Sequence, residues 1–111
     1  MGKEFGGRKM KYEQLISEVK NWAKDRGLDK SDSHAQGLKI AEELGELFEA
    51  FLKEHRDDEL DAVGDIQVTL IIYCLQRGID YKKCLADAYK VIENRKGKMI
   101  DGTFIKDSDL E

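Results

Sequence analysis

The sequence contains no proline, only two cysteines and no long apolar run. Without proline, nothing forces a break inside a long helix. Cys74 and Cys84 have no CxxC motif and no histidine partner, so we expect reduced, buried thiols and no zinc site. The longest apolar stretch, residues 66–75, includes Gln67 and Thr69 and is too short and too polar to span a bilayer. We therefore expect a cytoplasmic protein without a membrane partner.

Charge is distributed unevenly along the chain. The 111 residues carry a net charge of −4, but residues 42–65 hold ten acids and two bases, a net of −8, which leaves +4 elsewhere. This segregation argues against nucleic acid as the main partner and favours a cation site flanked by basic groups. Residues 1–9 hold three glycines and four charges, and we expect a leader or flexible arm there, with Met10 as an alternative start.

Apolar residues at helical spacing predict one all-α domain over residues 10–111. The first two helices are expected over about 12–27 and 34–53, and a polar loop supplies the cap of the second at Asp32 or Ser33. Strand-forming runs with a period of two are scarce, which excludes an extended sheet.

A third helix follows a short charged turn, with a cap at Asp57 or Asp58, and ends at Gly78. Its second half is apolar nearly all round, so we expect burial on every side, which in so small a domain calls for a partner chain. A fourth helix is expected over 80–97. In the tail after it, the Asp-Gly pair at 101–102 predicts a hairpin.

Acidic residues mark one face on each of two neighbouring predicted helices, in the segments EELGE and DAVGD. Within each segment the acids are three or four residues apart, so they project from one helix face. The short connection makes the two helices antiparallel neighbours, and their acidic faces can meet. Like charges repel there, and Mg²⁺, with Mn²⁺ as a substitute, is the cation that an all-oxygen site favours. The predicted metal ligands are Glu43, Glu46, Asp61 and Asp65.

Other residues of these segments bear on the same site. Gly45 and Gly64 stand at matching places, just before the last acid of each segment. A mid-helix glycine costs about 1 kcal/mol relative to alanine, so the pair suggests close approach of the two helices or of a ligand. Glu42 is equally compatible with the site and with a solvated position. We interpret the remaining acids as solvated helix or turn residues: Glu49, Glu54, Asp57, Asp58 and Glu59.

Basic and amide side chains supply candidates for phosphate binding. Lys90 and Asn94 are four residues apart on one face of the fourth helix, and Arg95 follows. Asparagine is a mediocre residue inside a helix, which favours a functional role for this pair. Lys39 lies one turn before Glu43, where it is either an ion-pair partner or a phosphate ligand.

Other classes of site lack their residues. Neither His34 nor His55 stands three residues after a glutamate, which excludes the di-iron bundle pattern, and we expect both histidines on the surface. The EF-hand, P-loop and GxGxxG patterns are absent, as are Ser-His-Asp and Cys-His arrangements. We interpret Trp22 and Tyr73 as core residues rather than platforms for base stacking.

The strings KIAEELGELFEAF and DAVGDIQVTLII resemble the MazG-like nucleoside triphosphate pyrophosphohydrolases, whose signature is EExxE, a spacer and ExxD. EELGE supplies the first half. In the second half Ala62 stands three residues before Asp65, and the nearest acid is Asp61, four before. The tail KVIENRKGKMIDGTFIKDSDLE is also similar to small phage-type or bacterial members, and the resemblance covers about residues 11–108.

The resemblance implies a fold like a four-helix bundle that assembles as a dimer or a dimer of dimers. It implies Mg²⁺-dependent hydrolysis of a nucleoside triphosphate, either a dNTP or a non-canonical NTP, to the monophosphate and pyrophosphate. The ion would lie on Glu43, Glu46 and Asp65, with Asp61 or Glu42 assisting, and the general base would be Glu42 or Glu43. The implied phosphate ligands are Lys90 and Asn94, with Lys39 or Arg95 as further candidates.

Two alternatives stay open. One is a non-catalytic helical dimer that serves as a nucleotide sensor or interaction module. Ala62 supports this alternative, because it stands where the signature has an acid. Replacing Ala62 by glutamate should raise activity if Asp61 is a poor substitute. The other is a dimeric dUTPase-like or phosphoribosyl-ATP-type pyrophosphohydrolase, with the same chemistry and a different base.

Overall fold

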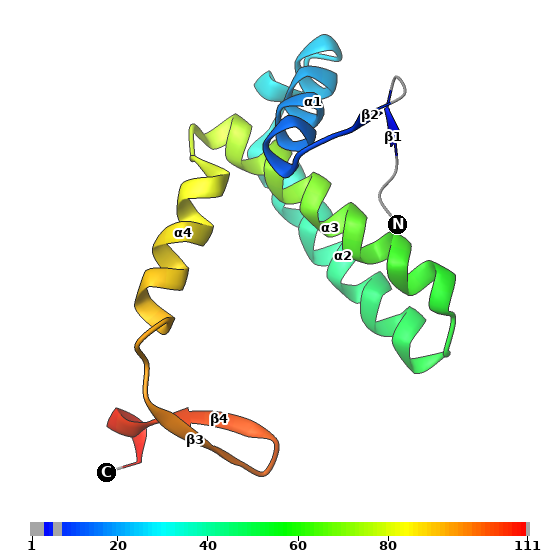
Figure 1. Ribbon diagram of the computed structural model, residues 1–111. Helices are drawn as coiled ribbons and strands as arrows, with labels where there is room; N and C mark the ends of the chain where they lie inside the picture. Colours follow the sequence, from blue (N-terminus) through cyan, green and yellow to red (C-terminus); the bar gives the residue numbers. More distant parts are fainter. Residues whose placement is uncertain (1–3, 6–7, 111) are drawn as a thin grey trace. The chain divides into compact units, whose positions relative to one another are not determined.

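The computed structural model describes residues 4–5 and 8–110 (Figure 1). The described part contains four helices: α1 (Tyr12–Asp25), α2 (Ser33–Leu52), α3 (Arg56–Arg77) and α4 (Tyr81–Ile92). Two short 3₁₀ helices accompany them, η1 (Leu28–Lys30) and η2 (Asp107–Asp109). Two antiparallel strand pairs complete it: β1 (Glu4–Phe5) with β2 (Arg8–Lys9), and β3 (Gly97–Ile100) with β4 (Thr103–Lys106). The all-α class is confirmed.

The chain divides into two units, residues 1–81 and 82–111, and each is described by itself. Of the leader expected over residues 1–9, residues 1–3 and 6–7 lie outside the described part, and the others form β1 and β2. In the described part of the chain, no helix is long and apolar enough to cross a membrane.

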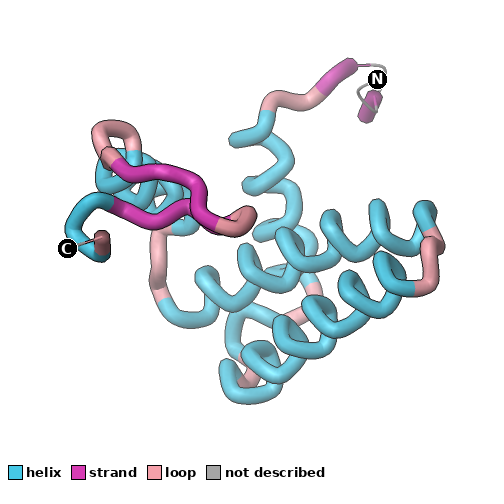
Figure 2. The backbone as a smooth tube through the Cα atoms, turned by 90° about the horizontal axis from the view of Figure 1, so that it is seen from below, coloured by secondary structure: helices cyan, strands magenta, loops and turns pink. Residues whose placement is uncertain are grey.

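α2 and α3 lie side by side as an antiparallel pair, and α1 packs against the second half of α3 (Figures 1 and 2). Across the pair, the Gln36 amide donates a 3.0 Å hydrogen bond to the carbonyl oxygen of Thr69. Near the end of α3, the Gln76 amide donates a 2.9 Å bond to the carbonyl oxygen of Leu28 in η1. The first bond fixes the position of α2 along α3, and the second fixes the position of η1 at the end of α3.

The turn between α2 and α3 is a Schellman motif. The N–H of His55 donates to the carbonyl of Ala50 at 2.9 Å, and the N–H of Glu54 donates to the carbonyl of Phe51 at 3.1 Å. Glu54 adopts a left-handed φ of 57°, a conformation that favours glycine. The motif lets α3 begin immediately after His55, so the acidic segments are held in register by a very short connection.

The predicted helix caps are right for α2 and wrong for α3. Asp32 caps α2 by accepting a 2.9 Å bond from the N–H of His34. The N-cap of α3 is His55, without a side-chain cap bond, and the predicted caps Asp57 and Asp58 lie in the first turn instead. Their charges complement the helix dipole there. The glycines predicted to end α1 and α3 follow those helices with positive φ, as expected.

The buried core lies where α1 meets the second half of α3. Ile16 and Ala23 of α1 are buried, and so are three residues of α3: Ile71, Ile72 and Cys74. These residues of α3 are buried within the chain itself, where α1 and η1 contact this half of the helix, and the expected partner chain stays a prediction. Neither Cys74 nor Cys84 forms a disulfide, but only Cys74 is buried as predicted; Cys84 is exposed.

α2 carries a second apolar face that is exposed. Its large residues, expected in the core, are 49–74% exposed: Leu38, Leu44, Phe48, Phe51 and Leu52. At about 100° per residue, these and the small residues between them cover an arc of about 140° that contains no charge. A Cβ added to Gly45 or Gly64 would meet nothing within 4 Å, so close approach of two helices at these glycines is wrong for the chain alone.

In the second unit, α4 ends at Ile92, earlier than the predicted end at Gly97. The predicted hairpin is present as β3 and β4. Asp101 and Gly102 turn it with φ values of 51° and 79°, both positive as in a type I′ turn. A Cβ on Gly97 would lie 2.6 Å from the Phe104 ring, so this strand start accommodates only glycine.

Candidate active site

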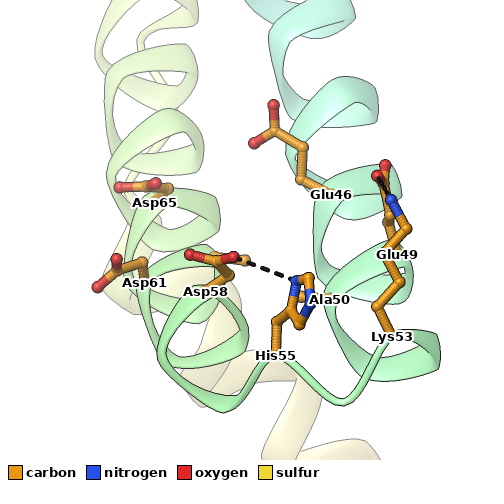
Figure 3. Close-up of a pocket in the computed structure, with 9 residues that line it drawn as sticks. Glu46, Glu49, Ala50, Lys53, His55, Asp58, Asp61 and Asp65 are labelled. Carbon is orange, nitrogen blue, oxygen red and sulfur yellow. Dashed lines mark hydrogen bonds and ion pairs between the residues drawn. The ribbon is translucent and has the colours of Figure 1, made fainter.

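The acidic faces of α2 and α3 border one open cavity of about 470 Å³ (Figure 3). Three of the four predicted metal ligands line it, Glu46 from α2 and both Asp61 and Asp65 from α3. The Glu46 carboxylate extends toward α3, and the two aspartates lie one turn apart on the facing helix. The other lining residues are Glu49, Ala50, Lys53, His55, Asp58 and Ala62.

Two small side chains bring the acidic faces together. Ala50 and Ala62 are 5% and 4% exposed, one on each helix, at the floor of the cavity. Because both side chains are small, α2 and α3 can pack closely where these alanines lie. The acids one turn away on each helix then border the cavity. Ala62, which occupies the position of an acid in the resembled signature, is therefore a packing residue here.

Glu43, the fourth predicted ligand, does not line the cavity but interacts with Glu46 and Asp65, which do, and it is only 7% exposed. Its Oε1 lies 4.0 Å from Lys39 Nζ, whereas its Oε2 is buried without a hydrogen-bond partner. Burial raises the pKa of Glu43 above its ordinary value, and interaction with Glu46 and the charge of Asp65 raise it further against the opposing charge of Lys39. This carboxylate thus combines burial, acidic neighbours and an unsatisfied oxygen.

The donor set fits a hard divalent cation such as Mg²⁺. With the side chains as placed, no three His, Cys, Asp or Glu residues of the described ranges 4–5 and 8–110 converge into a finished ligand set. The four predicted ligands offer only carboxylate oxygens, which Mg²⁺ prefers. A buried oxygen without a partner is costly unless a proton or a cation satisfies it. An ion beside Glu43 would satisfy that oxygen and offset the repulsion from Glu46 and Asp65.

The other predicted site residues are described within the unit that holds each of them. Glu42 is exposed on α2 and is not among the residues that line the cavity. Lys90 is exposed in the last turn of α4. Asn94 and Arg95 line an open, mainly basic cavity of about 510 Å³ in the second unit, together with Val91, Lys96, Lys106, Asp107 and Ser108. Within the first unit, Lys39 lies beside the predicted metal ligand Glu43.

Four further polar residues line the acidic cavity: Glu49 and Asp58, which are exposed as predicted, and Lys53 and His55, which the sequence analysis did not assign to the site. Lys53 Nζ pairs with Glu49 Oε1 at 2.7 Å, and this hydrogen bond lowers the pKa of Glu49. His55 Nδ1 lies 3.6 Å from Asp58 Oδ2, marked in Figure 3. Following the face of Glu46 along α2 in steps of three and four residues leads to Glu49 and Lys53, so the signal was present. Both histidines are exposed, as predicted.

Residues 11–91 match the model of the family described as phosphoribosyl-ATP pyrophosphohydrolase. The chain belongs to this family. The family falls within the MazG-like nucleotide pyrophosphohydrolase superfamily, so the sequence resemblance is right at that level, and membership of the narrower MazG family stays a prediction.

A relative from Haemophilus phage HP1 (strain HP1c1) is 38% identical over 69 residues, which is 61% of this chain. It is described as an uncharacterized 18.2 kDa protein in the rep-hol intergenic region, and this chain spans 42% of its length. No solved structure matches the chain.

Proposed function

We propose that the protein is a Mg²⁺-dependent pyrophosphohydrolase that cleaves a nucleoside triphosphate between its α- and β-phosphates. The observation that carries the proposal is the buried Glu43 carboxylate, with one oxygen unsatisfied, next to Glu46 and Asp65, which line the acidic cavity together with Asp61. Family membership supports the reaction class, because the family is described as a pyrophosphohydrolase that acts on a nucleotide. The geometry thus supports the metal site of the proposal, and the family supports its reaction class.

In this proposal the carboxylates have two roles, metal binding and proton transfer. Glu43, Glu46 and Asp65 hold Mg²⁺, assisted by Asp61 or Glu42, and the bound ion would neutralise phosphate charge and lower the pKa of a water. Either Glu42 or Glu43 accepts the proton of the attacking water. The water oxygen bonds to the α-phosphorus, the bond to the bridging oxygen breaks, and pyrophosphate leaves with the electron pair. The products are a nucleoside monophosphate and pyrophosphate.

Basic residues are proposed to hold the phosphates. Lys39 has the strongest support, because its ammonium lies 4.0 Å from Glu43, where it can reach a phosphate that enters the acidic cavity. Lys90, Asn94 and Arg95 are the further candidates from the second unit. A lysine attracts phosphate through its charge, in the bound substrate as well as in the transition state. Replacing any one of these phosphate ligands should therefore weaken substrate binding more than turnover.

We propose a dNTP or a non-canonical NTP as substrate, and the family name adds phosphoribosyl-ATP, which carries the same triphosphate. The test is product analysis over a panel of these nucleotides, with Mg²⁺, with Mn²⁺ and with EDTA. Equal amounts of monophosphate and pyrophosphate, formed only with the metal, are expected. Release of inorganic phosphate would contradict cleavage at the α–β bond, and no product from any nucleotide would favour a non-catalytic nucleotide-binding module.

We also propose that the protein works in the cytoplasm as a homodimer or homotetramer. The exposed arc of α2 supports assembly, since apolar faces of this extent are usually covered by a partner. The acids lie on another side of α2, so pairing through this arc would bring no carboxylates together.

A further inference from the structure

A groove of about 510 Å³ lies along α1 where this helix meets α3, and none of the roles above uses it. Its floor is apolar, formed by Met10, Leu15, Val19, Trp22 and Val68. Its remaining lining residues are polar or acidic: Glu18, Asn21 and Asp25. Trp22, the one tryptophan of the sequence, is 47% exposed, so its prediction as a core residue is wrong.

The indole of Trp22 is held in place although it is exposed. The guanidinium carbon of Arg26 lies 4.1 Å from the centroid of the Trp22 ring, and Arg26 Nη1 donates a 3.0 Å bond to the carbonyl oxygen of Trp22. This cation–π contact and hydrogen bond tie the side chain of Arg26 to its neighbour. An aromatic ring in the lining of an apolar groove is suited to stacking against a planar group, here through the face of the ring that Arg26 does not cover.

The groove continues the line of the acidic cavity along α3. Val68 in the groove is three residues beyond Asp65 in the cavity. Three residues correspond to about 4.5 Å along the helix axis and about 60° around it, so both side chains belong to one face of α3. A nucleotide whose α-phosphate lies at Asp65 therefore has its sugar and base within reach of Trp22.

The lining of the groove identifies the kind of group it accepts. Glu18 and Asp25 are carboxylates, and neither lysine nor arginine is among the residues that line the groove. The nearby cation Arg26 is already engaged with the ring and the carbonyl oxygen of Trp22, so a phosphate is disfavoured. Ionised carboxylates accept hydrogen bonds but do not donate them, and the amide of Asn21 can do both. The matching ligand is flat and apolar on its faces, with N–H donors at its edge. An aromatic base with an exocyclic amine has this chemistry.

We propose that the α1 groove binds the base of the substrate, with Trp22 as the stacking surface, and selects bases that carry an exocyclic amine. The proposal rests on the proposed function for the placement of the phosphates. It assigns base selection to α1 and metal binding to α2 and α3, so the two can be changed separately.

Trp22 itself reports on the groove, since the chain has no other tryptophan. Its fluorescence is measured while α,β-methylene ATP, α,β-methylene UTP, adenosine or pyrophosphate is added with Mg²⁺. We expect quenching by the ATP analogue and by adenosine, no quenching by pyrophosphate, and at least a fivefold weaker apparent affinity for the UTP analogue. Equal affinity for both analogues, or no response to adenosine, overturns the proposal.

Variants separate the groove from the metal site. Trp22→Ala should weaken binding of the ATP analogue about tenfold or more, measured by calorimetry, and Trp22→Phe should restore most of it. Asn21→Ala should reduce the preference over the UTP analogue. Unchanged affinity in Trp22→Ala, with its helical content intact, contradicts the proposal.

Two further outcomes keep this proposal distinct from the proposed function. Glu46→Gln should still show quenching by adenosine; if wild type and this variant both respond but no pyrophosphate forms, the groove assignment stands and the hydrolysis proposal fails. If pyrophosphate forms but Trp22 emission responds only to protein concentration, the groove binds a second copy, and the base assignment fails.

Discussion

Replacing Glu43 by glutamine should stabilise the metal-free protein while removing its activity. Glu43 is 7% exposed, its Oε2 has no partner, and Glu46 and Asp65 both disfavour its charge. An unsatisfied buried polar group costs about 1–3 kcal/mol. Lys39, 4.0 Å away, offsets part of this cost, so the expected gain is at the low end of the range, about 1 kcal/mol. For a domain of this size that corresponds to a rise of about 4 °C in the unfolding temperature.

The stability gained by Glu43→Gln should depend on pH, and the raised pKa of Glu43 gives the direction of that dependence. The folded-state pKa of Glu43 is raised, so between the unfolded and folded pKa values the folded protein binds more protons, and the contribution of Glu43 to stability falls as the pH rises. The advantage of Glu43→Gln should therefore be full at pH 8 and shrink toward pH 4. Thermal unfolding followed by circular dichroism in EDTA at both pH values measures it.

Glu49→Gln on the same helix is the matched control. Glu49 is exposed and bonded to Lys53, which lowers its pKa, so its contribution is present at neutral pH and is lost in acid. Its replacement should change stability little and in the opposite direction. If Glu43→Gln is no more stable than wild type at pH 8, or if its advantage is the same at both pH values, the reasoning about the buried carboxylate is refuted.

Two other substitutions test the turn and the exposed face. Glu54→Gly should raise the free energy of unfolding by about 1 kcal/mol in urea titrations, because glycine adopts the left-handed φ of 57° without strain; an unchanged or lower midpoint contradicts the Schellman assignment. Phe48→Glu should lower the mass measured by light scattering while the helical content is kept, whereas Lys24→Glu on α1 should not. An unchanged mass in Phe48→Glu would exclude the α2 arc as the assembly surface.

Local signals in the sequence predicted local structure well. Asp32 caps α2 because its side chain reaches an N–H two residues away, and the Asp101-Gly102 pair turns the hairpin because both residues accept positive φ. The spacing of the acids also placed Glu46, Asp61 and Asp65 on one cavity, since that required only helix geometry and a short turn. These features depend on neighbours within a few residues.

Features that depend on packing between residues far apart in the sequence could not be predicted in this way. Periodicity identifies an apolar face but not what covers it, so Phe48 and Trp22 were assigned to a core that leaves them exposed. The role of Ala62 became visible only when its burial against α2 was known. Glu54 gave no sign of its turn, because a glutamate in the left-handed region has no sequence signature.

The most direct test of the central claim compares pyrophosphate release by wild type, Glu46→Gln and Glu59→Gln, with Mg²⁺ and with EDTA. Glu59 pairs with Arg56 on α3 and does not line the acidic cavity, so it controls for the loss of one carboxylate. We predict Mg²⁺-dependent release by wild type and Glu59→Gln and a loss of at least a hundredfold in Glu46→Gln, in the range of losing one preorganised charged group. Release that persists in Glu46→Gln or in EDTA would contradict a metal site built on these carboxylates.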